Sequence, residues 1–349
     1  MKLYHFVLVF VVIAISVLVI TDIQTNDLKA VLHNKEQYDR NLDTAIDDAA
    51  TVLVQVDMNN KLMVNKDAAM ESFLYSLYSS YGVLSDPEAR EKLNLYIPVA
   101  LVTMEDGYYI FYSDTYTSGD GYTYVAKRWS EKFPYYYEDS DFIYGFTLGD
   151  IVTLYDKNGL LDSSGNQSVF QLDYHELITK DAYKSFRSKR PNSFLLSEES
   201  FEEVRKGSLI ALLEESMAYY TSQHNRIARQ YGITYNFSLP AVNEGQWEGY
   251  LDDISIFVVF QGYPYGDQVG ETYNRFASAG AKISKNRVYY LEQKGWYLLY
   301  HKSTCLHLNE DGILFQDTPY YDIETCVKEG AYACPDCIDN GAYPPDYEP

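Results

Sequence analysis

The sequence predicts an α+β protein. A long N-terminal helix precedes an antiparallel-sheet head with a helical insertion and a small C-terminal zinc-binding-like module. Residues 6–20 form an apolar run broken only by Ser16. No glycine occurs before Gly82, so nothing interrupts a helix that continues from this run. From Leu95 onward, β-branched and aromatic residues alternate as in strands, and all four cysteines lie near the C-terminus.

These observations divide the chain into four regions. We expect a transmembrane anchor at 1–24, a helical stalk at 25–94, an extracytoplasmic α+β head at 95–295, and a Cys/His module with an acidic tail at 296–349. The 349 residues, 46% of them hydrophobic, suffice for a sizeable core. The formal charge of −22 repels phosphate, which argues against nucleic acid as a partner. The 36 tyrosines are typical of half-buried strands or of an adhesive surface.

The apolar run at the N-terminus predicts a membrane contact through residues 4–23. With its apolar flanks it reaches about 20 residues, the length that crosses a bilayer. Lys2 precedes the run, which is consistent with a cytoplasmic N-terminus and with the rest of the chain outside a bacterial cell membrane. A cleaved signal peptide is the alternative, but the following TDIQTNDLKA has no good cleavage site. We therefore expect a single-pass anchor.

After the run, apolar residues recur at three- and four-residue steps, which indicates one face of an amphipathic helix. We expect this helix to extend from about residue 4 to 56, and a second helix at 66–81 to fold back on it. The stripe either packs on the head, as expected for its second half, or meets neighbouring subunits. In the second case Leu42→Lys and Ile46→Lys would abolish assembly and leave the head folded. The stripe comprises Leu28, Val31, Leu32, Tyr38, Leu42, Ala45, Ile46, Ala49, Leu53 and Val56.

The segment LDTAIDDAATVL, residues 42–53, resembles the Ala- and Asp-rich helix that follows the membrane segment in minor pilins of tight-adherence (Tad) pili. The resemblance is confined to the N-terminal helix. It implies a membrane-rooted helix that carries a globular head. It also implies protein partners through the stalk helix and the head, in a homo- or hetero-assembly.

The head is expected to be an antiparallel sheet interrupted by one long helix. A hairpin is predicted at 96–116 with its turn at Glu105–Gly107. The helix is predicted at 197–231, with Ser197 or Ser200 as its N-cap and Gly232 at its end. A short helix is predicted at 273–279. Further strands are predicted at 121–130, 142–159, 169–174, 233–242, 253–265 and 286–301.

We expect no enzyme, because the sequence contains no glycine-rich phosphate loop, no HExxH and no GxSxG motif. His175 and His224 stand without a partner pattern and are interpreted as structural. The acid pairs Glu214–Glu215 and Asp252–Asp253 are interpreted as solvated faces rather than acid/base groups. The loop 112–122 lacks the ligand alternation of an EF-hand, which favours a plain turn over a calcium site.

The Cys and His residues near the C-terminus have the spacing of a metal site. His301-x3-Cys305 and Cys334-x2-Cys337 form two pairs. Each pair can supply two ligands from one turn or strand end, and four such ligands close a tetrahedral structural zinc site. The helix expected between the pairs begins after Asp322 and ends at Gly330.

Disulfides and a redox CxxC pair remain open for these cysteines, because thiols outside the membrane tend to oxidise. Cys326 lies on the apolar side of the short helix and is interpreted as a buried packing residue rather than a ligand or a disulfide partner. His307 is a spare histidine that we expect at the surface.

The stretch YHKSTCLHL…YDIETCVKEGAYACPDC resembles a short module often found at the ends of bacterial extracytoplasmic proteins. It also resembles the amino-terminal zinc-binding domain of Ada DNA-repair proteins, which holds zinc by four cysteines. The matching positions are His301, Cys305, Cys334 and Cys337, with histidine in place of the first cysteine. The resemblance implies a structural zinc ion. It does not imply methyl acceptance, because nothing in this acidic chain indicates DNA binding.

Taken together, these patterns predict a membrane-anchored extracytoplasmic structural or interaction protein. The expected role is that of a pilin-like or envelope-apparatus subunit with a structural zinc module. The alternative is an extracytoplasmic ligand-binding or sensing domain, which would show a tyrosine-lined pocket with convergent polar groups. An enzyme would instead show clustered titratable groups in such a pocket.

Overall fold

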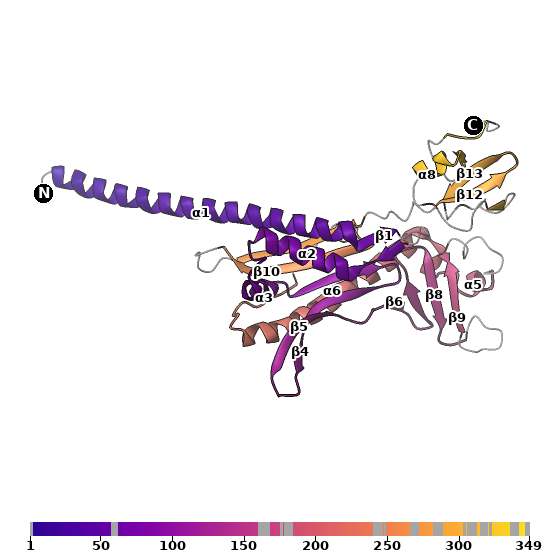
Figure 1. Ribbon diagram of the computed structural model, residues 1–349, viewed down its shortest axis with the longest axis horizontal. Coiled ribbons are helices and arrows are strands. Elements are labelled where there is room, and N and C mark those ends of the chain that lie inside the picture. Colours follow the sequence, from indigo (N-terminus) through magenta and orange to yellow (C-terminus); the bar gives the residue numbers. More distant parts are fainter. Residues whose placement is uncertain are drawn as a thin grey trace.

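The structure is a computed structural model of the chain, and Figure 1 shows its arrangement. We call the described residues from 38 to 281 the main body and the described residues from 289 to 345 the cysteine unit. Each has its own hydrophobic core. The described residues are 3–56, 62–159, 168–174, 177, 184–239, 247, 249–265, 272–281, 289–302, 305, 313–314, 320, 323–335 and 342–345.

The first helix, α1 (Leu3–Leu53), has 51 residues, which corresponds to a length of about 77 Å. Its first part projects beyond the rest of the molecule (Figure 1). Apolar side chains such as Phe10, Leu18 and Ile23 are exposed there. In the described part of the chain this is the one helix long and apolar enough to cross a membrane. The predicted continuous helix is thus present, but it ends at Leu53 rather than at about residue 56, because residues 54–56 pair as a strand with residues 62–64.

The second part of α1 packs into the core of the main body. Leu42, Ala45, Ile46, Ala49 and Leu53 are buried, and the helix lies against the next helix, α2 (Lys66–Ser80), and against two strands of a sheet. The prediction that the second half of the stripe packs on the globular part is confirmed. Lysine at position 42 or 46 would therefore place a charge in the core, so these substitutions do not separate assembly from folding.

Short capped elements connect α1 to the sheet. Strands β1 (Val54–Val56) and β2 (Leu62–Val64) pair with each other and return the chain to α2. The Asn65 side chain caps α2 by accepting a hydrogen bond from the Ala68 amide. Helix α3 (Pro87–Asn94), which the sequence analysis missed, follows and is capped by Asp86.

The central sheet has five antiparallel strands in the order β11-β10-β3-β4-β5. Consecutive residues of β3 and β10 are buried, so both faces of the sheet centre are covered. α1 lies against β10 and β11, whereas α6 lies against β3 and β4. The strands are β3 (Val99–Met104), β4 (Gly107–Thr117), β5 (Thr123–Trp129), β10 (Ser255–Pro264) and β11 (Thr272–Gly280).

Two predictions for this region are wrong. Residues 273–279 belong to strand β11 rather than to a helix, because they pair along β10, and Ala277 and Ala279 are buried in the core. Residues 233–239, the described part of the predicted strand 233–242, are not a strand. There the Asn225 side chain bonds both the backbone N–H and the C=O of Phe237, and so replaces a neighbouring strand.

A second antiparallel sheet, β6-β7-β8-β9, lies beside α6. Helix α6 (Glu198–Gln230) confirms the predicted long helix, with Ser197 as its N-cap. Buried residues recur along it in steps of about four from Phe201 to His224, which seats one face on the core. The other elements here are β6 (Tyr135–Glu138), β7 (Phe142–Phe146), β8 (Ile151–Asp156), β9 (Ser168–Asp173), α5 (Lys184–Lys189) and η2 (Phe194–Leu196).

The cysteine unit is a small four-stranded sheet in the order β14-β12-β13-β15, drawn in yellow and orange in Figure 1. The described part of the predicted strand 286–301 is two strands, β12 and β13, which form a hairpin, and β13 pairs with β15 in parallel. The helix between them, α8, confirms the predicted short helix, and Gly330 follows it with a positive φ of 83°. The elements are β12 (Tyr289–Lys294), β13 (Tyr297–Lys302), β14 (Ile313–Leu314), α8 (Ile323–Lys328) and β15 (Ala331–Ala333).

Candidate metal centre

The parallel pairing of β13 and β15 brings His301 and Cys334 together. Tyr300 is opposite Ala333 in the register, and the Cys334 amide donates a hydrogen bond of 3.1 Å to the Tyr300 carbonyl. Cys334 therefore lies beside His301 at the end of the two strands. Cys305 follows β13 closely, so it reaches the same place.

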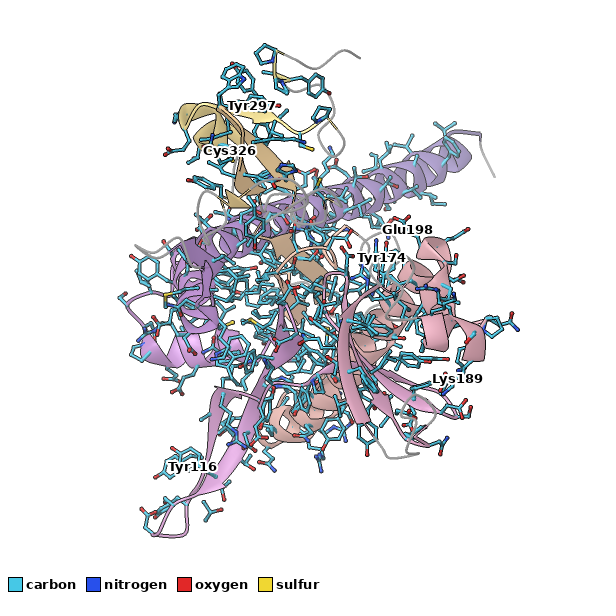
Figure 2. The ribbon with its side chains drawn as sticks, turned by 90° about the vertical axis from the view of Figure 1, so that its right-hand side faces the viewer. Tyr116, Tyr174, Lys189, Glu198, Tyr297 and Cys326 are labelled. Carbon is cyan, nitrogen blue, oxygen red and sulfur yellow. The ribbon has the colours of Figure 1, made fainter. Side chains whose placement is uncertain are left out.

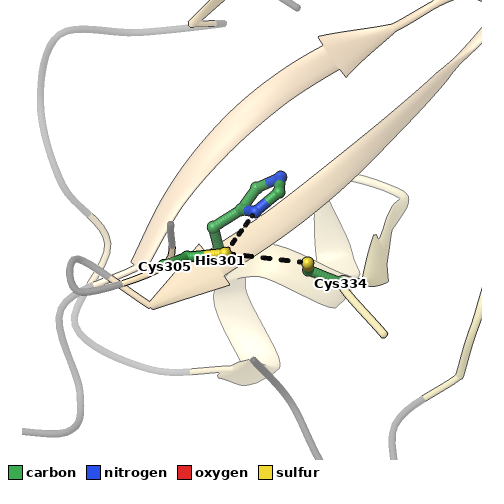
Figure 3. Close-up of side chains that lie close together, drawn as sticks. All are labelled: His301, Cys305 and Cys334. Atoms are coloured by element: carbon green, nitrogen blue, oxygen red, sulfur yellow. Dashed lines mark hydrogen bonds between the residues drawn. The ribbon is translucent and has the colours of Figure 1, made fainter. Parts of the chain in front are cut away.

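Figure 3 shows the three side chains converging. Nδ1 of His301 lies 3.3 Å from Sγ of Cys305, which lies 3.9 Å from Sγ of Cys334. The three ligand atoms are all within 4.8 Å of one another. Two sulfurs bound to zinc at about 2.3 Å in a tetrahedron lie about 3.8 Å apart, and a nitrogen and a sulfur about 3.5 Å apart. The group thus has the spacing of ligands around one ion.

The donor types and the burial also fit a metal ion. His301 and Cys334 are each 2% exposed, and Cys305 is half-buried. One imidazole and two thiols are the ligands that zinc prefers. The Cys305–Cys334 separation is almost twice the bond length of about 2.05 Å in a disulfide, so these two cysteines are not bridged in this structure. This His/Cys/Cys group could hold a metal ion.

Of the four predicted ligands, the structure brings together His301, Cys305 and Cys334. Cys337 lies outside the described residues, as does the spare His307. Cys326 is fully buried in the core of the cysteine unit, as its packing interpretation predicted (Figure 2). It does not belong to the convergent group among the described residues.

Sequence reasoning missed Glu292, which lies on the other side of the His301 ring. Its side chain is 3% exposed, and its Oε2 lies 3.0 Å from Nε2 of His301. Among the described residues, however, that imidazole nitrogen and the second carboxylate oxygen, Oε1, make no hydrogen bond of good geometry. The available signal was the strand alternation, which puts Glu292 on the same face of the hairpin as His301.

The isolated histidine of the main body is a buried structural group. His224 donates from Nε2 to the Leu95 carbonyl at 2.8 Å and accepts at Nδ1 from Ser113, at 3.2 Å. Burial, and then the charge of Lys127, lowers the pKa of His224 to about 3, so the ring is neutral at pH 7. The Ser113 hydroxyl is buried too, so this pair is not open to a substrate. His175 lies outside the described residues.

The acid pairs and the candidate calcium loop also have structural partners. Asp252 interacts with Arg205 and Lys206, and Glu214 accepts a hydrogen bond from the Trp247 indole. Asp114 pairs with Arg128 at 2.7 Å across the β4–β5 hairpin. Residues 112–117 belong to β4, and residues 118–122 form the turn of that hairpin, in agreement with the predicted turn.

Comparisons of the chain with protein-family models, with curated proteins and with solved structures found no match.

Proposed function

We propose that this protein is a membrane-anchored structural or interaction subunit of the cell envelope, pilin-like in its design, with its main body outside the cytoplasm. The observation that carries this proposal is a single helix with two different surroundings. The first part of α1 exposes apolar side chains on all sides, and its last part belongs to the core of the main body. A helix of this kind holds a folded body at a fixed position relative to a membrane.

A polar clamp supports the idea that helix and body act as one piece. Arg275 on β11 lies 3.3 Å from Asp39 and 2.7 Å from Asp43, both on α1. It also donates a hydrogen bond to the Asp39 carbonyl. The hydroxyl of Tyr273 donates to the Asp39 carboxylate at 2.7 Å. Half-buried, charge-assisted contacts of this kind fix the angle at which the helix leaves the body.

The surface for assembly is the part of α1 between the membrane run and the clamp. Leu28 and Leu32 are exposed there and lie four residues apart, on one side of the helix. In an assembly of parallel helices, this side would contact a neighbouring helix by ridges-into-grooves packing. The resemblance of residues 42–53 to the helix of minor pilins also supports this proposal.

The proposal is tested by a photoreactive residue at position 32 in the full chain, expressed in cells, with position 30 as the matched control. Leu32 and Ala30 are both exposed, but Ala30 lies on the opposite side of the helix. We expect the chain to stay in the membrane on alkaline extraction, external protease to cleave the main body in intact spheroplasts, and crosslinks to protein from position 32 only. Release by alkali, protection from the protease, or equal crosslinking from both positions would contradict the proposal.

For the cysteine unit we propose a structural zinc ion held by His301, Cys305, Cys334 and Cys337. The support is the spacing and burial of the first three side chains. Zinc is favoured over other ions because imidazole and thiolate in a tetrahedral arrangement suit it best. Its role would be to hold the fold of the unit together rather than to catalyse a reaction, since four protein ligands leave no open coordination position.

A ligand-binding role is the second candidate, and one observation favours it. The β4–β5 hairpin extends away from the main body, and Figure 2 shows Tyr116 on it. Tyr116, Tyr122 and Tyr124 are exposed there, and the rings of Tyr116 and Tyr124 stack at 5.5 Å. If the hairpin binds a ligand, replacing Tyr116 and Tyr124 by Ser would abolish ligand binding and leave assembly in the membrane unchanged.

A further inference from the structure

The β12–β13 hairpin places a buried carboxylate against the metal-site histidine. Glu292 is opposite Leu299 and Tyr290 is opposite His301 in the antiparallel register. Glu292 and His301 are therefore diagonal neighbours on one face of the hairpin, where long side chains can meet. Neither side chain is more than 3% exposed.

A buried carboxylate is costly unless a positive partner compensates it. Among the described residues, the candidate partner for the Glu292 carboxylate is His301, whose Nε2 lies 3.0 Å from Oε2. The ring nitrogen is not aligned with the carboxylate as a good hydrogen bond requires, and Oε1 is also unsatisfied. The two side chains are thus close enough to interact, but the neutral imidazole alone does not compensate the buried carboxylate. A cation bound to the other ring nitrogen would.

We propose that Glu292 is the positioning residue of the metal site: once the ion is bound, its carboxylate, 3.0 Å from Nε2 in this structure, accepts the Nε2–H of His301 and so leaves Nδ1 unprotonated and facing the ion. This inference rests on the metal site proposed above. Glu292 is not itself a ligand in this scheme, because it is absent from the group whose ligand atoms converge within 4.8 Å.

The choice of ring nitrogen is the physical core of this inference. Neutral imidazole carries one proton, and only the other nitrogen has a lone pair for a metal. Nδ1 faces Cys305 Sγ at 3.3 Å, whereas Nε2 faces the carboxylate. An acceptor at Nε2 selects the tautomer that can bind at Nδ1. A cation on Nδ1 in turn makes Nε2–H a stronger donor, which offsets the cost of burying Glu292.

The test compares zinc affinity for the full chain in detergent, by competition with a chelating dye, for wild type and for Glu292→Ala and Glu292→Gln. We expect Glu292→Ala to weaken binding about 10- to 100-fold. Glu292→Gln should lose less, because its amide oxygen still accepts a hydrogen bond but carries no charge. Leu299→Ala is the control for damage to packing, since Leu299 is buried opposite Glu292 and has no polar atom to offer.

A second readout separates positioning from general stability. One-bond ¹H–¹⁵N NMR spectra of the zinc-loaded chain with labelled histidine should show a slowly exchanging Nε2–H on His301 in wild type and in Leu299→Ala. In Glu292→Ala this proton should exchange rapidly. Unchanged affinity and an unchanged Nε2–H signal in Glu292→Ala would overturn the inference while leaving the zinc site intact. Absence of zinc binding by wild type would instead overturn the zinc site itself, and the inference with it.

Discussion

The main body and the cysteine unit differ in how they are held together. The main body buries large side chains such as Trp247, Phe257 and Phe73 between two sheets and several helices. The core of the cysteine unit, as far as it is described, contains only Tyr289, Leu291, Tyr300, Tyr320, Cys326, Ala331 and Ala333. Small units rarely bury enough apolar surface to fold alone, and metals or disulfides commonly make up the difference. The main body is thus stabilised by a large buried apolar area, whereas the cysteine unit has a small core, and it is this unit for which we propose a metal ion.

The largest effect is expected from His301→Ala. Structural zinc contributes about 10–16 kcal/mol of apparent binding free energy in small zinc units, and removing a ligand forfeits much of it. We expect residues 289–302 to lose hydrogen-exchange protection while the β3 and β10 amides keep theirs. Lys294→Ala, at an exposed position in the same hairpin, is the control. Equal protection of the hairpin in His301→Ala and wild type would show that the small core suffices.

Leu42→Ala should weaken the main body and spare the cysteine unit. Leu42 is fully buried although it belongs to α1, and truncating a buried leucine costs about 2–5 kcal/mol. Urea denaturation of the full chain in detergent, followed by tryptophan fluorescence, measures the change. Leu28→Ala, on the exposed part of the same helix, should stay within about 0.5 kcal/mol. If the two variants lose equal stability, α1 is not part of the core.

Acid should destabilise the main body through His224. Its folded pKa is lowered to about 3 by burial and by Lys127, against about 6.5 for an unfolded histidine. The unfolded chain therefore binds the proton first. The contribution of neutral His224 to the free energy of unfolding is fully present above about pH 6.5. It is lost as the pH falls toward the folded pKa, and the loss is about 2 kcal/mol at pH 5. Urea midpoints for wild type and His224→Gln across this range isolate the histidine, and parallel pH profiles would contradict this account.

The smallest effect is expected from Tyr116→Ala on the β4–β5 hairpin. Tyr116 is exposed and stacks only on another tyrosine of the same hairpin, Tyr124, in the contacts described. Its replacement should change the unfolding free energy by about 0.5 kcal/mol or less. A loss as large as that of Leu42→Ala, in the same urea experiment, would mean that the hairpin is part of the main core.

The sequence predicted the elements whose periodicity is long and uninterrupted. Helices α1, α2 and α6 follow from helical spacing, and α6 also from its caps, although α1 ends at Leu53 instead of about residue 56. The strand β11 was mistaken for a helix because its alanines favour helices locally, whereas pairing along β10 decides the matter. Tertiary pairing of this kind is not encoded in a short segment.

The same distinction applies to the candidate site. His301, Cys305 and Cys334 were found because their residue types and spacing are unusual. Glu292 was missed, because a glutamate in a strand ordinarily faces water. Only the register of β12 on β13 shows that this one faces the histidine.

The most direct test of this account is the zinc content and free-thiol count of the full chain, purified in detergent without added metal. About one zinc per chain, absent from His301→Ala, is the predicted result. A chain without zinc and without reactive thiols would contradict it and would make the cysteine unit a disulfide-linked fold.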